Sequence, residues 1–194
     1  MVTQSNLKFI FENIAEGSVL AFYRNEWYYQ TIPFFTKESK GEQVPSHCGI
    51  VYEVNKQGDT LTFMLSEQRF QGGQYRPIAI HKDKNNNYTI FDKYFKSQEL
   101  ITLHKINMSL NQIELGIKDA KQQVGKKYGY GNLIFGVEFI EKILPKIFFK
   151  WLDKKEGNRV CSTHVAYNLQ KAGFMLPKGD FLSPLEITKL NIYS

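Results

Sequence analysis

Runs in which apolar residues alternate with polar ones fill much of the first hundred positions of the chain. Such alternation is typical of β-strands, because successive side chains point to opposite faces of a sheet. Segments rich in Gly, Asp and Asn separate the runs and mark turns. We therefore predict strands over residues 19–23, 47–54, 60–67, 75–80 and 100–106.

The second and third of these strands are predicted to form a hairpin, with its loop at residues 55–59. If this loop closes symmetrically, Val54 lies opposite Thr60. Counting outward from that pair sets His47 directly opposite Glu67 and on the same face. The prediction is sensitive to the loop, because a change of one residue would move the two side chains to opposite faces.

A helical period replaces the alternation in the second half of the chain. Ser109 and Gln112 form a capping-box pattern ahead of apolar residues that recur at helix spacing until Gly125. Further helices are expected over residues 132–144 and 158–172.

A last short helix is predicted to start at Ser183, with Pro184 at its first position and Glu186 at its third. Strands followed by helices predict an α+β fold, an antiparallel sheet or partial barrel packed against helices.

The composition predicts one folded domain over residues 1–194. The chain has 194 residues, of which 42% are hydrophobic and 14% aromatic, enough to build a core. This composition excludes a wholly disordered chain. Two cysteines are too few for a small fold that depends on disulfide bonds. Lys8 and Glu12 interrupt the first apolar run, so we expect no signal peptide and a protein that is cytoplasmic or carried in an assembly.

The net charge of +6 is concentrated in one part of the chain. Residues 118–159 hold ten Lys/Arg against five acidic residues, which makes an anionic surface a candidate partner. No basic-aromatic motif accompanies the charge, so specific nucleic-acid binding is not expected. Charged residues interrupt the most apolar stretch, 133–152, and predict that it does not cross a membrane.

Cys161 is the candidate nucleophile. With Asn158 as the helix cap, its sulfur would lie in the first helical turn, near unpaired N–H groups and the positive end of the helix dipole. Both favour the thiolate, which is the reactive form of cysteine. A buried, inert cysteine is the alternative for Cys161 considered alone.

His47 and Glu67 complete a set that can perform acyl transfer. A carboxylate beside an imidazole fixes its tautomer, and an imidazole beside a thiol acts as its base. Their shared face is predicted to be apolar, and we expect the Cys161 helix to pack on it. The residues assigned to this face are Gly49, Val51, Leu61, Phe63 and Leu65.

Two further side chains compete for roles at the site. Cys48 follows His47 in the strand, so its side chain is expected on the opposite face, out of reach of Cys161. His164 is the rival base, on the same helix as Cys161, and ranks lower because no carboxylate partner is evident. No ligand spacing predicts a metal site, and no cofactor is expected.

The chain resembles the circularly permuted papain-like hydrolases. This group includes the YiiX-like amidases and the lecithin retinol acyltransferase-like proteins, relatives of the NlpC-type cell-wall peptidases. The resemblance rests on the order of five segments, with the histidine strand 161 − 47 = 114 residues before the cysteine helix. The segments are Ser46-His47-Cys48-Gly49-Ile50-Val51, Ser66-Glu67, Gly125-Lys126-Lys127-Tyr128, Val160-Cys161-Ser162-Thr163-His164-Val165 and Ser183-Pro184.

The resemblance implies a permuted papain-like fold with Cys161 as nucleophile, His47 as base and Glu67 as the residue that orients the base. It implies a cysteine peptidase or amidase that works through a thioester. The expected substrates are peptide, peptidoglycan-like or acyl compounds. One departure is that Gly129 follows the tyrosine of the Gly-x-x-Tyr segment, where many relatives carry an acidic residue.

Two other functions remain open at this point. The apolar face and lysines of residues 133–151 suit a lipid-directed acyltransferase or esterase on the same fold. A non-catalytic structural or binding module of a larger assembly is the second. Selective labelling of Cys161 by a thiol probe separates an enzyme from such a module.

Overall fold

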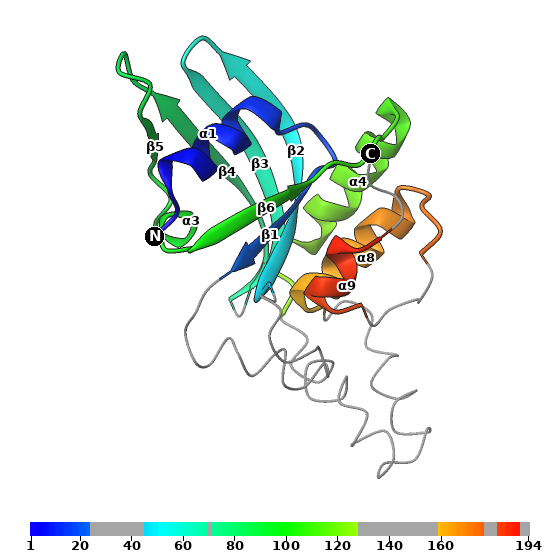
Figure 1. Ribbon diagram of the computed structural model, residues 1–194. Helices are drawn as coiled ribbons and strands as arrows, with labels where there is room; N and C mark the ends of the chain where they lie inside the picture. Colours follow the sequence, from blue (N-terminus) through cyan, green and yellow to red (C-terminus); the bar gives the residue numbers. More distant parts are fainter. Residues whose placement is uncertain (24–44, 70, 128–158, 177–181, 191–194) are drawn as a thin grey trace, which may run out of the picture.

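The computed structural model describes residues 1–23, 45–69, 71–127, 159–176 and 182–190 (Figure 1). The strands are β1 (Val19–Tyr23), β2 (His47–Gln57), β3 (Thr60–Arg69), β4 (Gly72–Lys82), β5 (Tyr88–Ile90) and β6 (Leu100–His104). The helices are α1 (Gln4–Asn13), α3 (Lys93–Lys96), α4 (Leu110–Gln123), α8 (Cys161–Lys171) and α9 (Pro184–Thr188). The expected helix over 132–144 lies outside the described residues.

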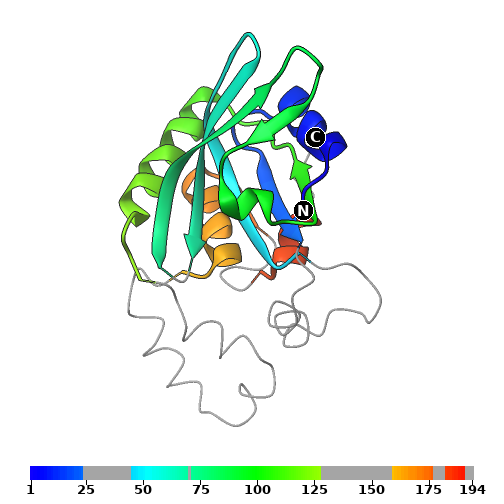
Figure 2. The ribbon, with the colours of Figure 1, turned by 90° about the vertical axis from the view of Figure 1, so that its left-hand side faces the viewer.

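The strands form one curled, antiparallel, six-stranded sheet in the order β5-β4-β3-β2-β1-β6 (Figures 1 and 2). The α+β class and the antiparallel sheet are therefore confirmed. Every central strand begins or ends within a few residues of its predicted bounds, because alternation and β-branched residues signal strands locally. No described helix is long and apolar enough to cross a membrane.

The hairpin between β2 and β3 differs from the prediction. Gln57 pairs with Thr60, so only Gly58 and Asp59 form the turn, and Gly58 has a φ of 55°. An irregularity between Tyr52 and Asn55 then shifts the register. The predicted five-residue loop is wrong, because the strands continue through polar residues whose pattern resembles a loop.

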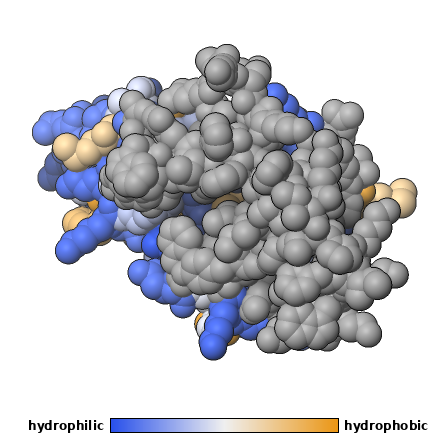
Figure 3. Space-filling view, turned by 90° about the horizontal axis from the view of Figure 1, so that it is seen from below, coloured by the Kyte–Doolittle hydropathy of each residue, from blue (hydrophilic) through white to orange (hydrophobic). Residues whose placement is uncertain are grey.

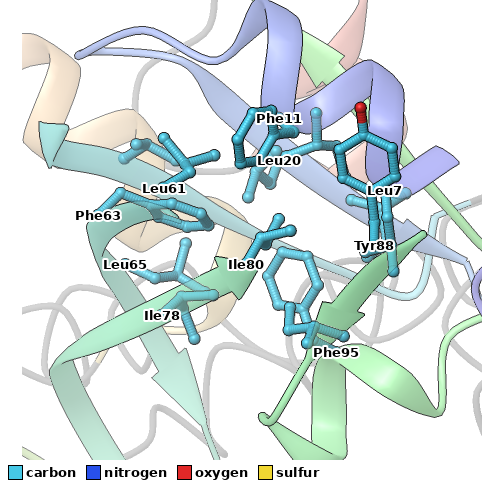
Figure 4. Close-up of a cluster of buried hydrophobic side chains, with 14 of the residues drawn as sticks. Leu7, Phe11, Leu20, Leu61, Phe63, Leu65, Ile78, Ile80, Tyr88 and Phe95 are labelled. Atoms are coloured by element: carbon cyan, nitrogen blue, oxygen red, sulfur yellow. The ribbon is translucent and has the colours of Figure 1, made fainter. Parts of the chain in front are cut away.

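Two clusters of buried side chains cover the two faces of the sheet. The α1 face holds the larger cluster, in which Leu7 and Phe11 of α1 and Phe95 of α3 pack on strand residues (Figure 4). On the opposite side, the α8 face, helix α8 packs on β2 and β3, and α4 and α9 flank it.

The α8 helix therefore lies on the face opposite to the predicted one. Val165 and Leu169 of α8 pack with Cys48, Ile50 and Tyr52 of β2. The apolar side chains that share a face with His47 pack instead with α1 and α3. Both faces of β2 are apolar in sequence, so its pattern could not tell which face takes which helix.

Candidate active site

His47 and Glu67 lie on the same face of adjacent strands, the α1 face. Glu67 pairs with Gly49 rather than directly with His47, so the predicted register is off by two residues. A shift of two keeps every side chain on its face, since the side-chain period of a strand is two. His47 and Glu67 are consequently diagonal neighbours.

Gly49 makes this diagonal approach possible. A Cβ atom at Gly49 would lie 2.9 Å from Leu65 Cδ1, 3.0 Å from the Ser66 carbonyl oxygen and 3.2 Å from Glu67 Cβ. Any larger residue would push β3 away from the start of β2. The room that Gly49 leaves is therefore used by β3 and not by a packed helix.

A short hydrogen bond joins the two side chains. His47 Nε2 lies 2.7 Å from Glu67 Oε2, and Glu67 is fully buried. Burial raises the pKa of Glu67, but the bond and charge of His47 and the charges of Arg69 and Arg76 outweigh it and lower the pKa to about 2. Glu67 is therefore a permanent anion at neutral pH.

Cys161 lies in the first turn of α8, as predicted, and is the first residue of the helix. The cap is Val160 and not Asn158, which lies outside the described residues. The Thr163 hydroxyl accepts a hydrogen bond from the Val160 N–H at 2.9 Å and closes this end of the helix. Cys161 thus lies at the positive end of an 11-residue helix, where unpaired N–H groups stabilise an anion.

The starts of β2 and α8 lie at the same end of the sheet, the lower end in Figure 1, and this brings Cys161 to His47. The Cys161 and His47 side chains lie close enough for each to shift the pKa of the other. Because Nε2 of the imidazole is engaged by Glu67, Nδ1 is the nitrogen left to exchange a proton with the sulfur. The structure therefore brings together all three predicted site residues, in the order Cys161, His47, Glu67.

Charge stabilises the protonated imidazole. Burial lowers the pKa of His47, but hydrogen bonds to Cys161 and Glu67 and the charges of both raise it to about 9. At neutral pH the histidine is therefore an imidazolium beside the sulfur.

Cys48 is also in contact with Cys161, contrary to the prediction. Its side chain does point away from the His47 face, but α8 packs on that other face, so the two thiols meet. The Cys48 thiol and its backbone N–H lie close enough to Cys161 to lower the pKa of its thiol. Both cysteines are free and buried.

The two sulfurs differ sharply in acidity. The neighbouring Cys48 lowers the pKa of Cys161, burial opposes this shift, and the adjacent His47 lowers the pKa of Cys161 as well. Burial raises the pKa of Cys48 well above its usual value, and the nearby Cys161 raises it again. The thiolate is thus assigned to Cys161, and Cys48 remains a thiol donor.

Buried polar side chains tie α8 to the sheet and to α4. The Tyr52 hydroxyl donates to Asn168 Oδ1, and Asn168 Nδ2 donates to the Gly116 carbonyl at 2.9 Å. Arg159, just ahead of α8, donates to both carboxylate oxygens of Asp119 at 2.6 and 3.1 Å. These bonds fix the height and angle at which α8 presents Cys161.

His164, the rival base, has a different partner. Its Nε2 lies 2.8 Å from Ser66 Oγ, and the side chain is fully buried. Burial, followed by the charge of Arg159, lowers the pKa of His164 to about 4. His164 is therefore a neutral residue that links α8 to β3.

Three charged residues near Glu67 were not assigned to the site from the sequence. Arg76 Nε donates to Glu67 Oε1 at 2.6 Å, and Arg69 Nε lies 2.8 Å from the same oxygen. Arg76 also bonds to Asp92. A signal was available for Arg76, because it shares the period-two face of β4 with the buried Ile78 and Ile80. A charged residue on a buried face needs a partner.

Within the described ranges, no group of three or more His, Cys, Asp or Glu side chains could hold a metal ion. Seen from below, the visible described residues are mainly hydrophilic (Figure 3).

In comparisons with known proteins, no protein-family model and no curated protein matches the chain. Function is therefore inferred from the chemistry of the site.

Proposed function

We propose that the protein is a cysteine hydrolase of the permuted papain-like type that cleaves an amide or peptide bond through a thioester. The observation that carries the proposal is that Cys161 lies beside His47, whose other side is hydrogen bonded to Glu67. Nucleophile, base and orienting acid in this arrangement are what acyl transfer requires. The histidine strand ahead of the cysteine helix along the chain fits the permuted order.

The first half of the reaction uses the ion pair of thiolate and imidazolium. The Cys161 thiolate attacks the substrate carbonyl carbon, and the N–H groups at the start of α8 donate to the resulting oxyanion. The C–N bond then breaks, and the leaving amine takes the proton from His47. Cys161 now carries the acyl group as a thioester, and His47 is neutral.

The second half regenerates the enzyme. Neutral His47 takes a proton from a water molecule, whose oxygen attacks the thioester carbonyl. The C–S bond breaks, the carboxylic acid leaves, and the thiolate and imidazolium are restored. Glu67 holds the ring through both halves, since its carboxylate accepts from Nε2.

No specific observation favours either the lipid-directed enzyme or the non-catalytic module. The apolar stretch behind the lipid-directed version, residues 133–151, lies outside the described residues. A non-catalytic module would have no need for a buried carboxylate, an imidazolium and an acidic thiol in contact. Transfer to an acceptor other than water would use the same acyl-enzyme.

An activated ester such as p-nitrophenyl acetate provides the test. We expect the acyl group on Cys161 by intact mass and peptide mapping, and a turnover about 10⁴-fold lower or more in Cys161→Ala. In Cys48→Ala the acyl group should still map to Cys161. An acyl group spread over lysines, or an unchanged rate in Cys161→Ala, would overturn the proposal.

A further inference from the structure

The hydrogen-bonded set at the site extends beyond Glu67 into β4. Leu65 pairs with Arg76, and Glu67 pairs with Gly49, so His47, Glu67 and Arg76 occupy one face of three adjacent strands. They form a diagonal line across the sheet. The two oxygens of Glu67 are divided along this line: Oε2 lies 2.7 Å from His47 Nε2, and Oε1 lies 2.6 Å from Arg76 Nε.

Arg76 is itself held from the far side. Its Nη1 donates to Asp92, and Asp92 caps α3 by accepting from the Phe95 N–H at 2.8 Å. Tyr94, the residue before Phe95 in α3, packs its ring edge-on against His47 with 5.7 Å between ring centres. The guanidinium is therefore held by one carboxylate at Nε and by another at Nη1, and the second carboxylate caps the helix that contacts the imidazole.

The reaction gives this arginine a task that His47 cannot perform for Glu67. While His47 is an imidazolium, it supplies the counter-charge of the buried carboxylate. In the acyl-enzyme His47 is neutral, and a buried carboxylate without a counter-charge would take up a proton or turn away. An arginine keeps its charge at every pH of interest, so Arg76 can hold Glu67 in both states.

We propose that Arg76 is a positioning residue that keeps the Glu67 carboxylate against His47 while His47 is neutral, and so acts mainly on hydrolysis of the acyl-enzyme. The inference rests on the function proposed above. Arg69 shares Glu67 Oε1 and stacks on Tyr94 at 3.7 Å, but no second carboxylate of the described residues pairs with it as Asp92 does with Arg76.

The test separates acylation from deacylation in pre-steady-state kinetics with p-nitrophenyl acetate. In Arg76→Met we expect deacylation to slow by about 10- to 100-fold, as for a misplaced catalytic group, and acylation to change far less. Acyl-Cys161 should then accumulate in intact mass spectra. Arg76→Lys, which keeps the charge without the planar fork, should give an intermediate rate.

A double-variant cycle shows whether Arg76 acts through Glu67. Glu67→Gln and the double variant Glu67→Gln/Arg76→Met should deacylate at the same rate, because no carboxylate remains to be held. If Arg76→Met alone does not fold, Arg76→Lys takes its place in the cycle, and it should slow deacylation beside Glu67 but not beside Glu67→Gln. Equal slowing of both steps in Arg76→Met, or a full additional loss on the Glu67→Gln background, would overturn the inference. If wild-type Cys161 is never acylated, the proposed function fails instead.

Discussion

The two faces of the sheet are built differently. The α1 face is a broad apolar core in which Phe, Leu and Ile side chains of helix and strands interlock, with the charged line of Glu67 and Arg76 at one end. The α8 face has a smaller apolar cluster, and polar bonds such as that of Tyr52 to Asn168 run through its middle. Apolar packing tolerates small shifts, whereas hydrogen bonds with fixed partners set position. The face that must place Cys161 is the one with the polar ties.

Breaking the Arg159–Asp119 ion pair on the α8 face should have the largest effect on stability. In Arg159→Leu the buried Asp119 loses its counter-charge and keeps only the weaker bond from Asn168, and we expect the free energy of unfolding to fall by about 3–5 kcal/mol. Urea unfolding at pH 7 measures it. The exposed pair of Lys121 and Glu53, 3.1 Å apart, is the control, and Lys121→Met should cost less than about 1 kcal/mol. Equal losses in both variants would show that the Asp119 pair does not anchor α8.

Acid should weaken the two faces in separate pH ranges. His164 has a folded pKa of about 4 against an ordinary 6.5, so the unfolded chain binds the proton first and stability falls from pH 6.5 to 4. Glu67 has a folded pKa of about 2 against 4.5, so its stabilisation is present above pH 4.5 and is lost as the pH falls to 2. Protonation across each of these pH ranges should lower the free energy of unfolding by about 3 kcal/mol.

Urea unfolding of the wild type and of His164→Gln at several pH values distinguishes the two ranges. The variant should lose the fall between pH 6.5 and 4 and keep the one below 4.5. An unaltered profile in His164→Gln would show that the α8 face carries no buried neutral histidine.

A smaller effect compares one hydroxyl on each face. Tyr52→Phe leaves Asn168 Oδ1 buried without its donor, and we expect a loss of about 1–3 kcal/mol. Tyr88→Phe on the α1 face should cost less than about 0.5 kcal/mol, because among the described residues its hydroxyl makes no hydrogen bond. Thermal or urea unfolding measures both, and a reversed order would contradict the difference between the faces.

The smallest expected effect concerns the thiol beside the nucleophile. Cys48→Ala removes a thiol that helps to lower the pKa of Cys161, so the pKa of Cys161 should rise toward its ordinary value. One hydrogen bond corresponds to about a two- to tenfold lower labelling rate of Cys161 by iodoacetamide at pH 6. An unchanged rate would show that Cys48 does not donate to the thiolate.

The sequence predicted elements and site residues better than it predicted their three-dimensional relations. Alternation located β1 to β4, and the capping residues Ser109 and Ser183 located the starts of α4 and α9, because these signals are local. The prediction that His47 and Glu67 share a face was still correct despite the wrong register, because the register error was two residues. The packing face of α8 is a long-range choice between two apolar faces, so the meeting of Cys48 with Cys161 could not be predicted.

Alkylation of Cys161 as a function of pH tests the central claim most directly. Iodoacetamide rates mapped by peptide mass should show Cys161 reacting far faster than Cys48 at pH 6, because its pKa is lowered by the hydrogen bond from Cys48 and by His47. The rate should change again near pH 9, where His47 loses its proton. His47→Ala should abolish the advantage at pH 6. Equal, slow labelling of both cysteines up to pH 8 in the wild type would contradict the account.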